Sequence, residues 1–463
     1  MNTTVVTIAG QSFPGGVHPP QKKDLTTDSP IQPGPAVKQV AVLLSQHTGA
    51  VCKPTVTEGN IVQAGQLIGD SDAFISAPVH SPIDGRVKQI ALQSHPVLGR
   101  AQAIIIEPHA TMPTKRPRPK DQEVFKADLD LDKFPPQQIC TAVRRAGIVG
   151  MGGAGFPTAV KLEPNPDRPK DTMIVNGCEC EPYITCDYRL MLEWPSQIIA
   201  GIKLARKAAG CSTVLIAVED NKPAAIQALN DTLKTTPGCD NIKIVLVKTK
   251  YPQGGERQLI KAVLGRYVPT GGIPPMIGVL VINVATAAAI ADALILNSPL
   301  THRVVTVTGE AIAHPGNYYV AVGTPVIELI EFCGGVTQKS SKVIIGGPMM
   351  GIAIADLAMP VTKTTGAVTI LTKEQIGRAK YKRRQTTCIH CGRCLRVCPE
   401  HLNPTKIAHA VQKNRLDIAE SYFITACIEC GCCSYICPAN IELTGYIRTG
   451  KIYLARQKKL MPQ

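Results

Sequence analysis

The sequence predicts a multidomain protein that combines α/β and β-rich domains with a C-terminal cysteine-rich module. Three patterns support this prediction. Short β-like segments separated by Gly and Pro fill residues 33–108, strand and helix signals alternate between residues 137 and 300, and eight cysteines recur in two matched runs near the C-terminus. A chain of 463 residues is long enough for three or four domains.

The chain is basic, which narrows the class of partner. Lys and Arg exceed Asp and Glu by 50 to 35, and the basic residues concentrate in Lys115–Lys120, Lys380–Arg384 and Lys451–Lys459. The last two runs flank the cysteine-rich module and predict salt-sensitive docking to an acidic partner or an anionic lipid surface. A solvated linker explains the first run equally well. We expect no nucleic-acid partner, because no aromatic residues interleave with the basic ones.

Two segments bear on membranes and secretion. The N-terminus lacks the basic start, apolar core and small-residue cleavage site of a signal peptide. Met276–Leu296 is long enough to span a bilayer, but it contains Asn283 and Asp292 and changes midway. Val279–Ile282 is strand-like and Ala285–Leu296 is helix-like, so we expect a strand that runs into a helix.

After an N-terminal segment (residues 1–32), residues 33–110 form the first predicted domain. Val56–Ile68 and Ala77–Val87 look like the two halves of a barrel-sandwich, similar to biotinyl and lipoyl carrier domains. Those carriers present a lysine at a hairpin tip, whereas Arg86 follows the Asp84-Gly85 turn here, so no attachment lysine is evident. We expect this domain to be structural.

Residues 130–300 alternate between strands and helices, which favours an α/β sheet covered by helices. Helical signal is clearest at Ser196–Ala209. The predicted strands are Thr172–Val175, Thr213–Val218, Ile242–Val247 and Val279–Asn283.

A glycine-rich loop, Gly147–Thr158, precedes the first of these strands. Gly152, Gly153 and Gly155 would let the backbone approach a ligand and present N–H groups to a phosphate. Such loops are often only tight turns, and no Gly-Lys-Ser/Thr closes this one as in a Walker loop.

A polar segment, Asn176–Pro182, follows the strand Thr172–Val175. Because α/β sheets bind ligands at the carboxyl ends of their strands, Glu179 and Glu181 could accept hydrogen bonds from a ribose or a nicotinamide amide. A solvated turn is the alternative. Cys178, Cys180 and Cys186 match no standard metal motif, which disfavours a third metal site.

The two cysteine runs carry the strongest chemical signal. Each reads C-x-x-C-x-x-C-x-x-x-C-P, the spacing that binds a [4Fe–4S] cluster and sends its fourth cysteine to the partner cluster. Two alternatives are disfavoured. A structural zinc site would need only two C-x-x-C pairs, and a disulfide framework is typical of secreted chains, for which the N-terminus gives no signal. The expected ligands are Cys388, Cys391, Cys394 and Cys437 for one cluster, and Cys427, Cys430, Cys433 and Cys398 for the other.

Two further expectations concern this module, which spans residues 373–450. Cys432 lies inside the second run, but the spacing is complete without it, so we interpret it as a buried spectator thiol. Apolar residues within Pro404–Tyr422 predict a helix between the runs, which favours a helical two-cluster ferredoxin module over the smaller β-rich kind.

The combined motifs resemble a known family over essentially the whole chain. Four motifs look like the flavin domain of the NADH-oxidising subunit of respiratory complex I. They are the glycine loop with Lys161, the Asn-x-x-Glu-x-Glu-Pro turn, Gly254-Gly255-Glu256 and Asn283-Val284-x-Thr286. The fuller pattern is similar to the RnfC component of the bacterial Rnf ion-translocating electron-transport complex. That pattern adds Phe13–Pro20, Asn176–Tyr183, Tyr251–Glu256 and the two cysteine runs.

The resemblance implies a barrel-sandwich domain, a complex I-like α/β flavin domain, a β-grasp-type domain at residues 301–366 and a helical two-cluster module. It also implies FMN-binding or NADH-binding roles for Gly152, Gly153, Gly155, Phe156, Lys161, Asn176, Glu179, Glu181, Glu256 and Asn283. Met151 and Cys178 stand where complex I has arginine and aspartate, so contacts at these positions do not carry over.

The resemblance further implies a peripheral subunit on the cytoplasmic face of the inner membrane, within a complex that couples electron exchange between NADH and ferredoxin-level acceptors to ion movement. We expect NADH to reduce FMN and single electrons to pass through two [4Fe–4S] clusters to partner subunits, with no side chain acting as a general acid or base. Two alternatives remain open: a relay subunit with a vestigial flavin pocket, and a soluble NADH diaphorase subunit.

Overall fold

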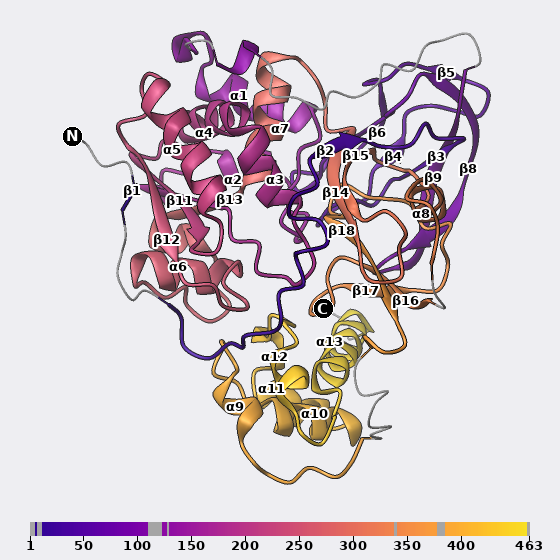
Figure 1. The fold of residues 1–463 in the computed structure, drawn as a ribbon, viewed down its shortest axis with the longest axis vertical. Coiled ribbons are helices and arrows are strands. Elements are labelled where there is room, and N and C mark those ends of the chain that lie inside the picture. The colour runs from indigo at the N-terminus through magenta and orange to yellow at the C-terminus, as the bar shows by residue number, and fades with distance from the viewer. Residues whose placement is uncertain are drawn as a thin grey trace.

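The computed structural model describes residues 5–6, 12–109, 123–126, 129–337, 340–376 and 385–460. The basic runs Lys115–Lys120 and Lys380–Arg384 lie outside these residues. The chain forms an α/β region, two β-rich regions and a helical C-terminal module that lies below them (Figure 1). No helix among the described residues has both the length and the apolar character needed to cross a bilayer.

The α/β region is built on a parallel five-stranded sheet in the order β1-β12-β11-β10-β13. Apolar side chains cover both of its faces, as expected for a parallel sheet with helices on each side. Its strands are β1 (Val5–Val6), β10 (Thr172–Asn176), β11 (Thr213–Glu219), β12 (Ile242–Val247) and β13 (Val279–Asn283). The four strands predicted from the sequence are confirmed to within one residue at each end.

Helices cover both faces of this sheet. Leu259 and Ile260 of α6 (Glu256–Leu264) pack on one face, and the larger core on the other face includes α4 (Pro195–Ala209) and α7 (Val284–Ile295). The remaining helices of the region are α1 (Pro136–Arg145), α2 (Thr158–Leu162), α3 (Cys186–Glu193) and α5 (Pro223–Thr235). Because β13 runs directly into α7, the strand-then-helix interpretation of Met276–Leu296 is confirmed.

The first β-rich region consists of two small sheets that enclose one apolar core. Val40, Ile68 and Ile104 are fully buried between them. One sheet has the order β3-β9-β8-β5 and the other β4-β6-β7. Their strands are β3 (Val40–Leu43), β4 (Lys53–Pro54), β5 (Ile61–Val62), β6 (Leu67–Asp70), β7 (Val79–His80), β8 (Gly85–His95) and β9 (Gly99–Pro108).

The second β-rich region is a mixed six-stranded sheet in the order β17-β16-β18-β14-β15-β2, accompanied by α8 (Val326–Phe332). Its edge strand β2 (Ile31–Pro33) comes from the N-terminal segment and pairs in parallel with β15. The other strands are β14 (His302–Thr308), β15 (Gly316–Ala321), β16 (Ser340–Ile345), β17 (Ile352–Ile354) and β18 (Ala367–Thr372).

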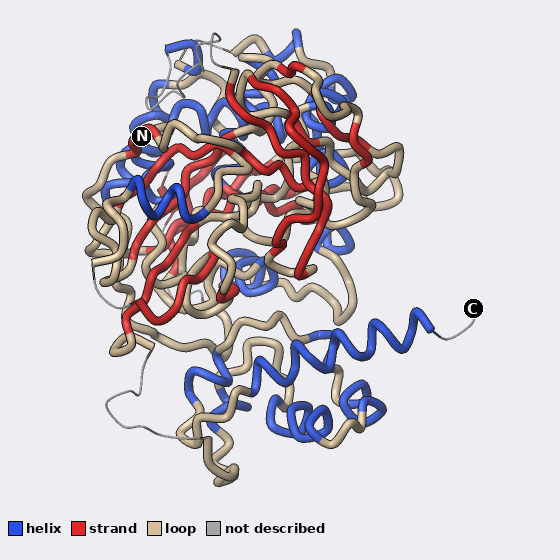
Figure 2. Tube along the Cα trace, turned by 90° about the vertical axis from the view of Figure 1, so that its right-hand side faces the viewer, coloured by secondary structure: helices blue, strands red, loops and turns tan. Residues whose placement is uncertain are grey.

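Within residues 385–460 of the C-terminal module, all regular secondary structure is helical, as Figure 2 shows. They are α9 (Arg393–Arg396), α10 (Pro404–Gln412), α11 (Leu416–Ser421), α12 (Cys432–Ile436) and α13 (Leu443–Leu460). The single helix expected over Pro404–Tyr422 is wrong. Asn414 adopts a left-handed backbone with φ of 51° and separates α10 from α11, a conformation that asparagine tolerates better than most residues.

The N-terminal strap, residues 12–33, connects three of these regions. It runs between the α/β region and the module before it enters the six-stranded sheet (Figure 1). Val17 bridges Tyr251 of the α/β region, and the Gly16 N–H donates to the Val397 carbonyl of the module at 2.8 Å. The strap therefore joins the cysteine-rich module to the rest of the chain.

Candidate functional site

The glycine loop lies at the carboxyl edge of the parallel sheet. The Met151 N–H donates to Thr286 Oγ1 at 3.0 Å, and a Cβ on Gly152 would stand 3.4 Å from Asn283 Cβ. Gly153 has φ of 117°, and a Cβ there would meet no atom within 4 Å. The loop is thus held from behind while its backbone at Gly153 faces open space, as a phosphate-binding backbone requires.

Side chains from both β-rich regions also fix this loop. Thr48 donates through its N–H to the Gly155 carbonyl (3.0 Å) and through its hydroxyl to the Ala154 carbonyl (3.1 Å). Lys363 Nζ donates to the carbonyls of Pro78 (2.6 Å) and Gly147 (2.7 Å). Burial lowers the pKa of Lys363 to about 7. The flavin loop expected from the sequence therefore lies where three regions meet.

Two asparagines occupy paired positions at adjacent strand ends. Asn176 of β10 and Asn283 of β13 are partners in register. Asn176 Nδ2 donates to the Gly254 carbonyl at 2.9 Å, and Asn283 Nδ2 donates to Asp187 Oδ2 at 2.6 Å. The Asn283 side chain also accepts from the Ala285 N–H and begins α7.

Lys161 brings charge to the same edge. Its Nζ lies 3.1 Å from Glu256 Oε1 and 3.3 Å from the Val281 carbonyl. Five residues that the sequence predicts to contact FMN or NADH therefore converge on one sheet edge: Gly152, Lys161, Asn176, Glu256 and Asn283. The exposed fractions of the Lys161 and Glu256 side chains, 27% and 39%, leave both accessible to a ligand.

In the acidic turn after β10, Glu179 is buried and Glu181 is half-buried, so the alternative of a solvated turn is wrong. The Glu179 carboxylate accepts the Asp187 N–H at 2.8 Å and the Tyr188 N–H at 3.4 Å, at the start of α3. Glu181 Oε1 accepts the N–H groups of Met349 (2.7 Å) and Met350 (2.9 Å), and burial raises the pKa of Glu181. Both carboxylates thus bind protein backbone and hold the turn in place.

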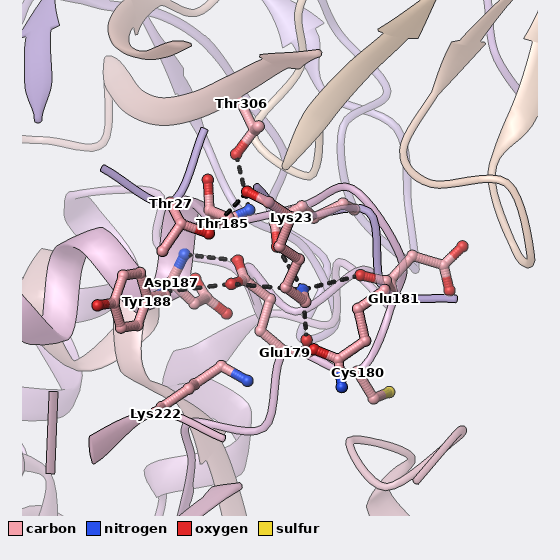
Figure 3. Close-up of polar contacts among 12 residues, drawn as sticks. Lys23, Thr27, Glu179, Cys180, Glu181, Thr185, Asp187, Tyr188, Lys222 and Thr306 are labelled. Atoms are coloured by element: carbon pink, nitrogen blue, oxygen red, sulfur yellow. Dashed lines mark hydrogen bonds and ion pairs between the residues drawn. The ribbon is translucent and has the colours of Figure 1, made fainter. Parts of the chain in front are cut away.

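Lys23 of the N-terminal strap lies at the centre of this turn (Figure 3). Its Nζ donates to the carbonyls of Glu179 (2.8 Å), Glu181 (3.0 Å) and Ile184, and stands 4.0 Å from Glu179 Oε2. Burial lowers the pKa of Lys23. Sequence reasoning missed this lysine because its partners lie more than 150 residues away in the chain.

Asp187 is a second residue that the sequence did not indicate. Burial, followed by the nearby Glu179 carboxylate, raises the pKa of Asp187 to about 7. The three thiols considered for a third metal site have separate surroundings: Cys178 Sγ approaches the Ala217 carbonyl, Cys180 Sγ accepts the Gly254 N–H, and Cys186 lies beside Glu179 and Asp187.

The cysteine runs bring sulfur atoms from both halves of the module together. Five thiols line one cavity beside α12 and α13: Cys432 and the set Cys398, Cys427, Cys430 and Cys433. This set is the one that the spacing assigns to the second cluster, and four thiols are the donors such a cluster needs. Cys388 and Cys437 pack against an apolar cluster that contains both Cys394 and Cys433, while Cys391 is exposed.

The cavity of the second run borders the α/β region and the six-stranded sheet. The Tyr251 hydroxyl donates to the Cys430 carbonyl at 2.7 Å, and a Cβ on Gly431 would lie 2.8 Å from the Met349 carbonyl oxygen. Cys432 is fully buried and packs in the same apolar cluster as Val17 and Tyr251. Contacts from the strap, the α/β region and the six-stranded sheet therefore surround the second run.

Comparison with known families agrees with this arrangement. A model of the RnfC barrel sandwich hybrid domain matches residues 11–111, and a model of the Nuo51 FMN-binding domain matches residues 143–292. Residues 304–353 match an SLBB domain and residues 380–438 match a 4Fe-4S dicluster domain.

Two curated proteins are similar along most of their length. The RnfC-type component of the proton-translocating ferredoxin:NAD(+) oxidoreductase complex of Clostridium ljungdahlii is 41% identical over 406 residues, covering 87% of this chain and 85% of that protein. Its counterpart in the Na(+)-translocating complex of Acetobacterium woodii is 41% identical over 410 residues and 89% of each chain. A solved NAD+-reducing [NiFe]-hydrogenase covers 74% of this chain and 65% of its own at a TM-score of 0.48 and 22% identity, a likeness too low to support an inference.

Proposed function

This chain belongs to the RnfC family, whose members are components of ion-translocating ferredoxin:NAD(+) oxidoreductase complexes, and from that premise we propose that it exchanges electrons between NADH and partner subunits through FMN and two [4Fe–4S] clusters. The complex that contains it is an oxidoreductase and a translocase. Within that complex, this chain supplies the cofactor sites of the NADH side.

One observation carries this function. The segment Lys250–Glu256 contributes Gly254 and Glu256 to the flavin edge, and it also contributes Tyr251 to the second cysteine run. A single short loop thus touches both sites. Rigid contact between two redox sites keeps the distance between them constant, which suits electron transfer better than a flexible linker would.

The flavin edge fits FMN through its backbone and its charges. Gly153 leaves room for a phosphate, Gly152 and Gly155 let the loop pack closely against Asn283 and Thr364, and Lys161 supplies a cation beside them. Asn176, Asn283 and Glu256 place amide and carboxylate groups at the strand ends. Phe156, Glu179 and Glu181 complete the proposed set, with the two glutamates acting by holding the turn rather than by presenting free carboxylates. When bound, FMN accepts a hydride from NADH and releases its electrons singly, which is chemistry of the cofactor itself.

For the clusters we propose the crossed ligand sets. Cys398 of the first run joins Cys427, Cys430 and Cys433, because all four line one cavity and the ligand spacing is complete without Cys432, which lines it too. Cys437 of the second run joins Cys388, Cys391 and Cys394. Cys432 is not a ligand in this assignment.

The finer surroundings are also proposals. The six-stranded sheet with α8 suits a β-grasp-type domain, and the protein is a peripheral component on the cytoplasmic face of the inner membrane. Arg393 and Arg396 of α9 are exposed within the first run, as is Cys391, which suits an acidic, ferredoxin-like partner there. The last basic run suits lipid less well, because Lys451 pairs with Glu429 and Lys458 with Glu420.

The substitution Gly153→Ala tests the flavin site. Its methyl group would enter open space beside the loop, so protein purified without oxygen should lose FMN and NADH-dependent dye reduction while it keeps its iron. Gly210→Ala is the matched control, because Gly210 also has positive φ and open space but ends α4 away from this edge. Equal FMN content in the two variants would contradict the placement of the flavin.

A further inference from the structure

Each cysteine run places a threonine hydroxyl against its third cysteine. Thr405 Oγ1 lies 2.9 Å from Cys394 Sγ, and Thr444 Oγ1 lies 3.4 Å from Cys433 Sγ. Both threonines come eleven residues after the cysteine that they contact. The ligand spacing alone does not demand this repetition, since the cysteine positions are complete without any hydroxyl.

Helix starts put the two hydroxyls in place. Thr405 is the second residue of α10, and Thr444 is the second residue of α13. α10 begins where the Asn403 side chain accepts the Lys406 N–H. Since the two helices follow the two fourth cysteines at the same interval, each brings its threonine back to the third sulfur of its own run.

The direction of these hydrogen bonds follows from the chemistry of a metal-bound sulfur. A cysteine that binds iron is a thiolate without a proton. The threonine O–H must then be the donor and the sulfur the acceptor. Hydrogen bonds to ligand sulfurs are among the factors that set the reduction potential of an iron–sulfur cluster, because they stabilise the more negative, reduced form.

The second run adds a further donor. The Ser434 hydroxyl donates to Thr444 Oγ1 at 3.0 Å, while the Thr444 N–H donates to Ser434 Oγ at 2.9 Å. A hydroxyl that accepts one hydrogen bond becomes a stronger donor in the next. Leu395 occupies the corresponding position in the first run and has no hydroxyl to give.

We propose that Thr405 and Thr444 set the reduction potentials of the two clusters by donating hydrogen bonds to Cys394 and Cys433, and that Ser434 strengthens this effect in the second run only. This inference rests on the proposed cluster sites. It assigns to each cluster its own tuning residue, so the two potentials can be changed independently.

The test is a redox titration of the full-length protein, purified without oxygen and followed by electron paramagnetic resonance. Thr405→Val should lower the potential of one cluster and Thr444→Val that of the other. A tenfold change in the ratio of oxidised to reduced cluster at a given potential corresponds to about 59 mV for one electron. Thr405→Ser and Thr444→Ser keep the hydroxyl, so both clusters should have the wild-type potentials in these variants.

Two further variants separate the hydroxyl effect from general disturbance. Ser434→Ala leaves Thr444 in place and should lower only the potential that Thr444→Val lowers, by a smaller amount. Thr449→Val removes an exposed hydroxyl that bonds the Gly445 carbonyl on α13, and it should change neither potential.

Iron content distinguishes the possible failures. If wild-type protein lacks two clusters, the proposed function fails. If both clusters are present, three results would overturn the tuning role. The valine variants could leave the potentials unchanged, both valine variants could shift the potential of the same cluster, or the serine variants could shift the potentials as far as the valine variants do.

Discussion

The two cysteine runs have the same backbone but different surroundings. In the outer run, Cys388–Cys398, and the inner run, Cys427–Cys437, corresponding residues share unusual positive φ angles: His390 and Glu429 at 55° and 58°, and Gly392 and Gly431 at 71° and 80°. Yet Cys391 of the outer run is exposed, whereas its counterpart Cys430 is only 7% exposed. The ligand spacing determines the backbone, and neighbouring regions determine what each run can reach.

The residue before the third cysteine shows the difference most clearly. In the outer run it is Arg393, which is exposed, and in the inner run it is Cys432, which is fully buried in one cluster with Val17 and Tyr251. We infer that electrons pass between the flavin and the inner run, and between the outer run and a partner. Four predictions test this comparison.

The largest effect concerns the crossing of ligands between the runs. Cys398→Ala changes the outer run, but it should abolish the inner cluster and lower the iron content from about eight to about four per chain. Its paramagnetic resonance spectrum should match that of Cys427→Ala and differ from that of Cys388→Ala. Cys432→Ala should keep all of its iron. A Cys398→Ala spectrum identical to that of Cys388→Ala would show that the runs bind clusters separately.

A matched glycine pair tests the packing of the inner run. Gly392→Ala and Gly431→Ala each place alanine in a left-handed backbone, at a cost of about 1–2 kcal/mol. Only Gly431→Ala also forces a methyl group to 2.8 Å from the Met349 carbonyl oxygen, since Gly392 has open space. We expect a lower melting temperature and slower cluster reduction by NADH for Gly431→Ala than for Gly392→Ala, measured by calorimetry and stopped flow. Equal effects would mean that the inner run is not held by the six-stranded sheet.

The contact between Tyr251 and the inner run has a smaller expected effect. Burial raises the pKa of Tyr251, so its phenol stays protonated and donates to the Cys430 carbonyl. Tyr251→Phe leaves that carbonyl without this donor, which should destabilise the protein by about 1–3 kcal/mol and slow electron transfer to the inner cluster. Tyr453→Phe, which alters an exposed ring on α13, serves as the control and should transfer electrons at the wild-type rate.

The smallest effect concerns charge. Glu429 pairs with Arg448 at 3.0 Å and Lys451 at 2.7 Å, while its outer counterpart is His390. These side chains are about a third exposed, so Glu429→Gln should change stability by less than about 1 kcal/mol. It should raise the potential of the inner cluster, because two cations lose their carboxylate partner, and the shift should shrink in high salt. His390→Gln removes no carboxylate and should leave both potentials unchanged.

The sequence predicted local structure well and long-range contacts poorly. The strands β10 to β13 follow from apolar runs of the right length, and the cysteine spacing is itself a local geometric constraint. By contrast, Glu179 and Glu181 are polar residues beside a proline, a pattern typical of exposed turns. Their burial depends on Lys23 and on the Met349–Met350 backbone, which no local pattern connects with them.

The break between α10 and α11 has a local cause that periodicity obscured. Apolar residues continue at helical spacing across Asn414, so the pattern favoured one helix. The left-handed conformation of Asn414 allows the chain to turn while both short helices still pack on α13. Lys363 was missed for a different reason, because its partners Pro78 and Gly147 belong to two other regions.

The N-terminal strap has a consequence for biogenesis. Gly15 packs so closely on the module that a Cβ there would lie 2.9 Å from the Cys398 carbonyl oxygen, and the Gly16 N–H donates to the Val397 carbonyl. The ribosome makes these glycines first and their partners nearly four hundred residues later. The strap can therefore reach its final position only after the cysteine-rich module has emerged. Closure of the strap thus reports that the cysteine-rich module has been made.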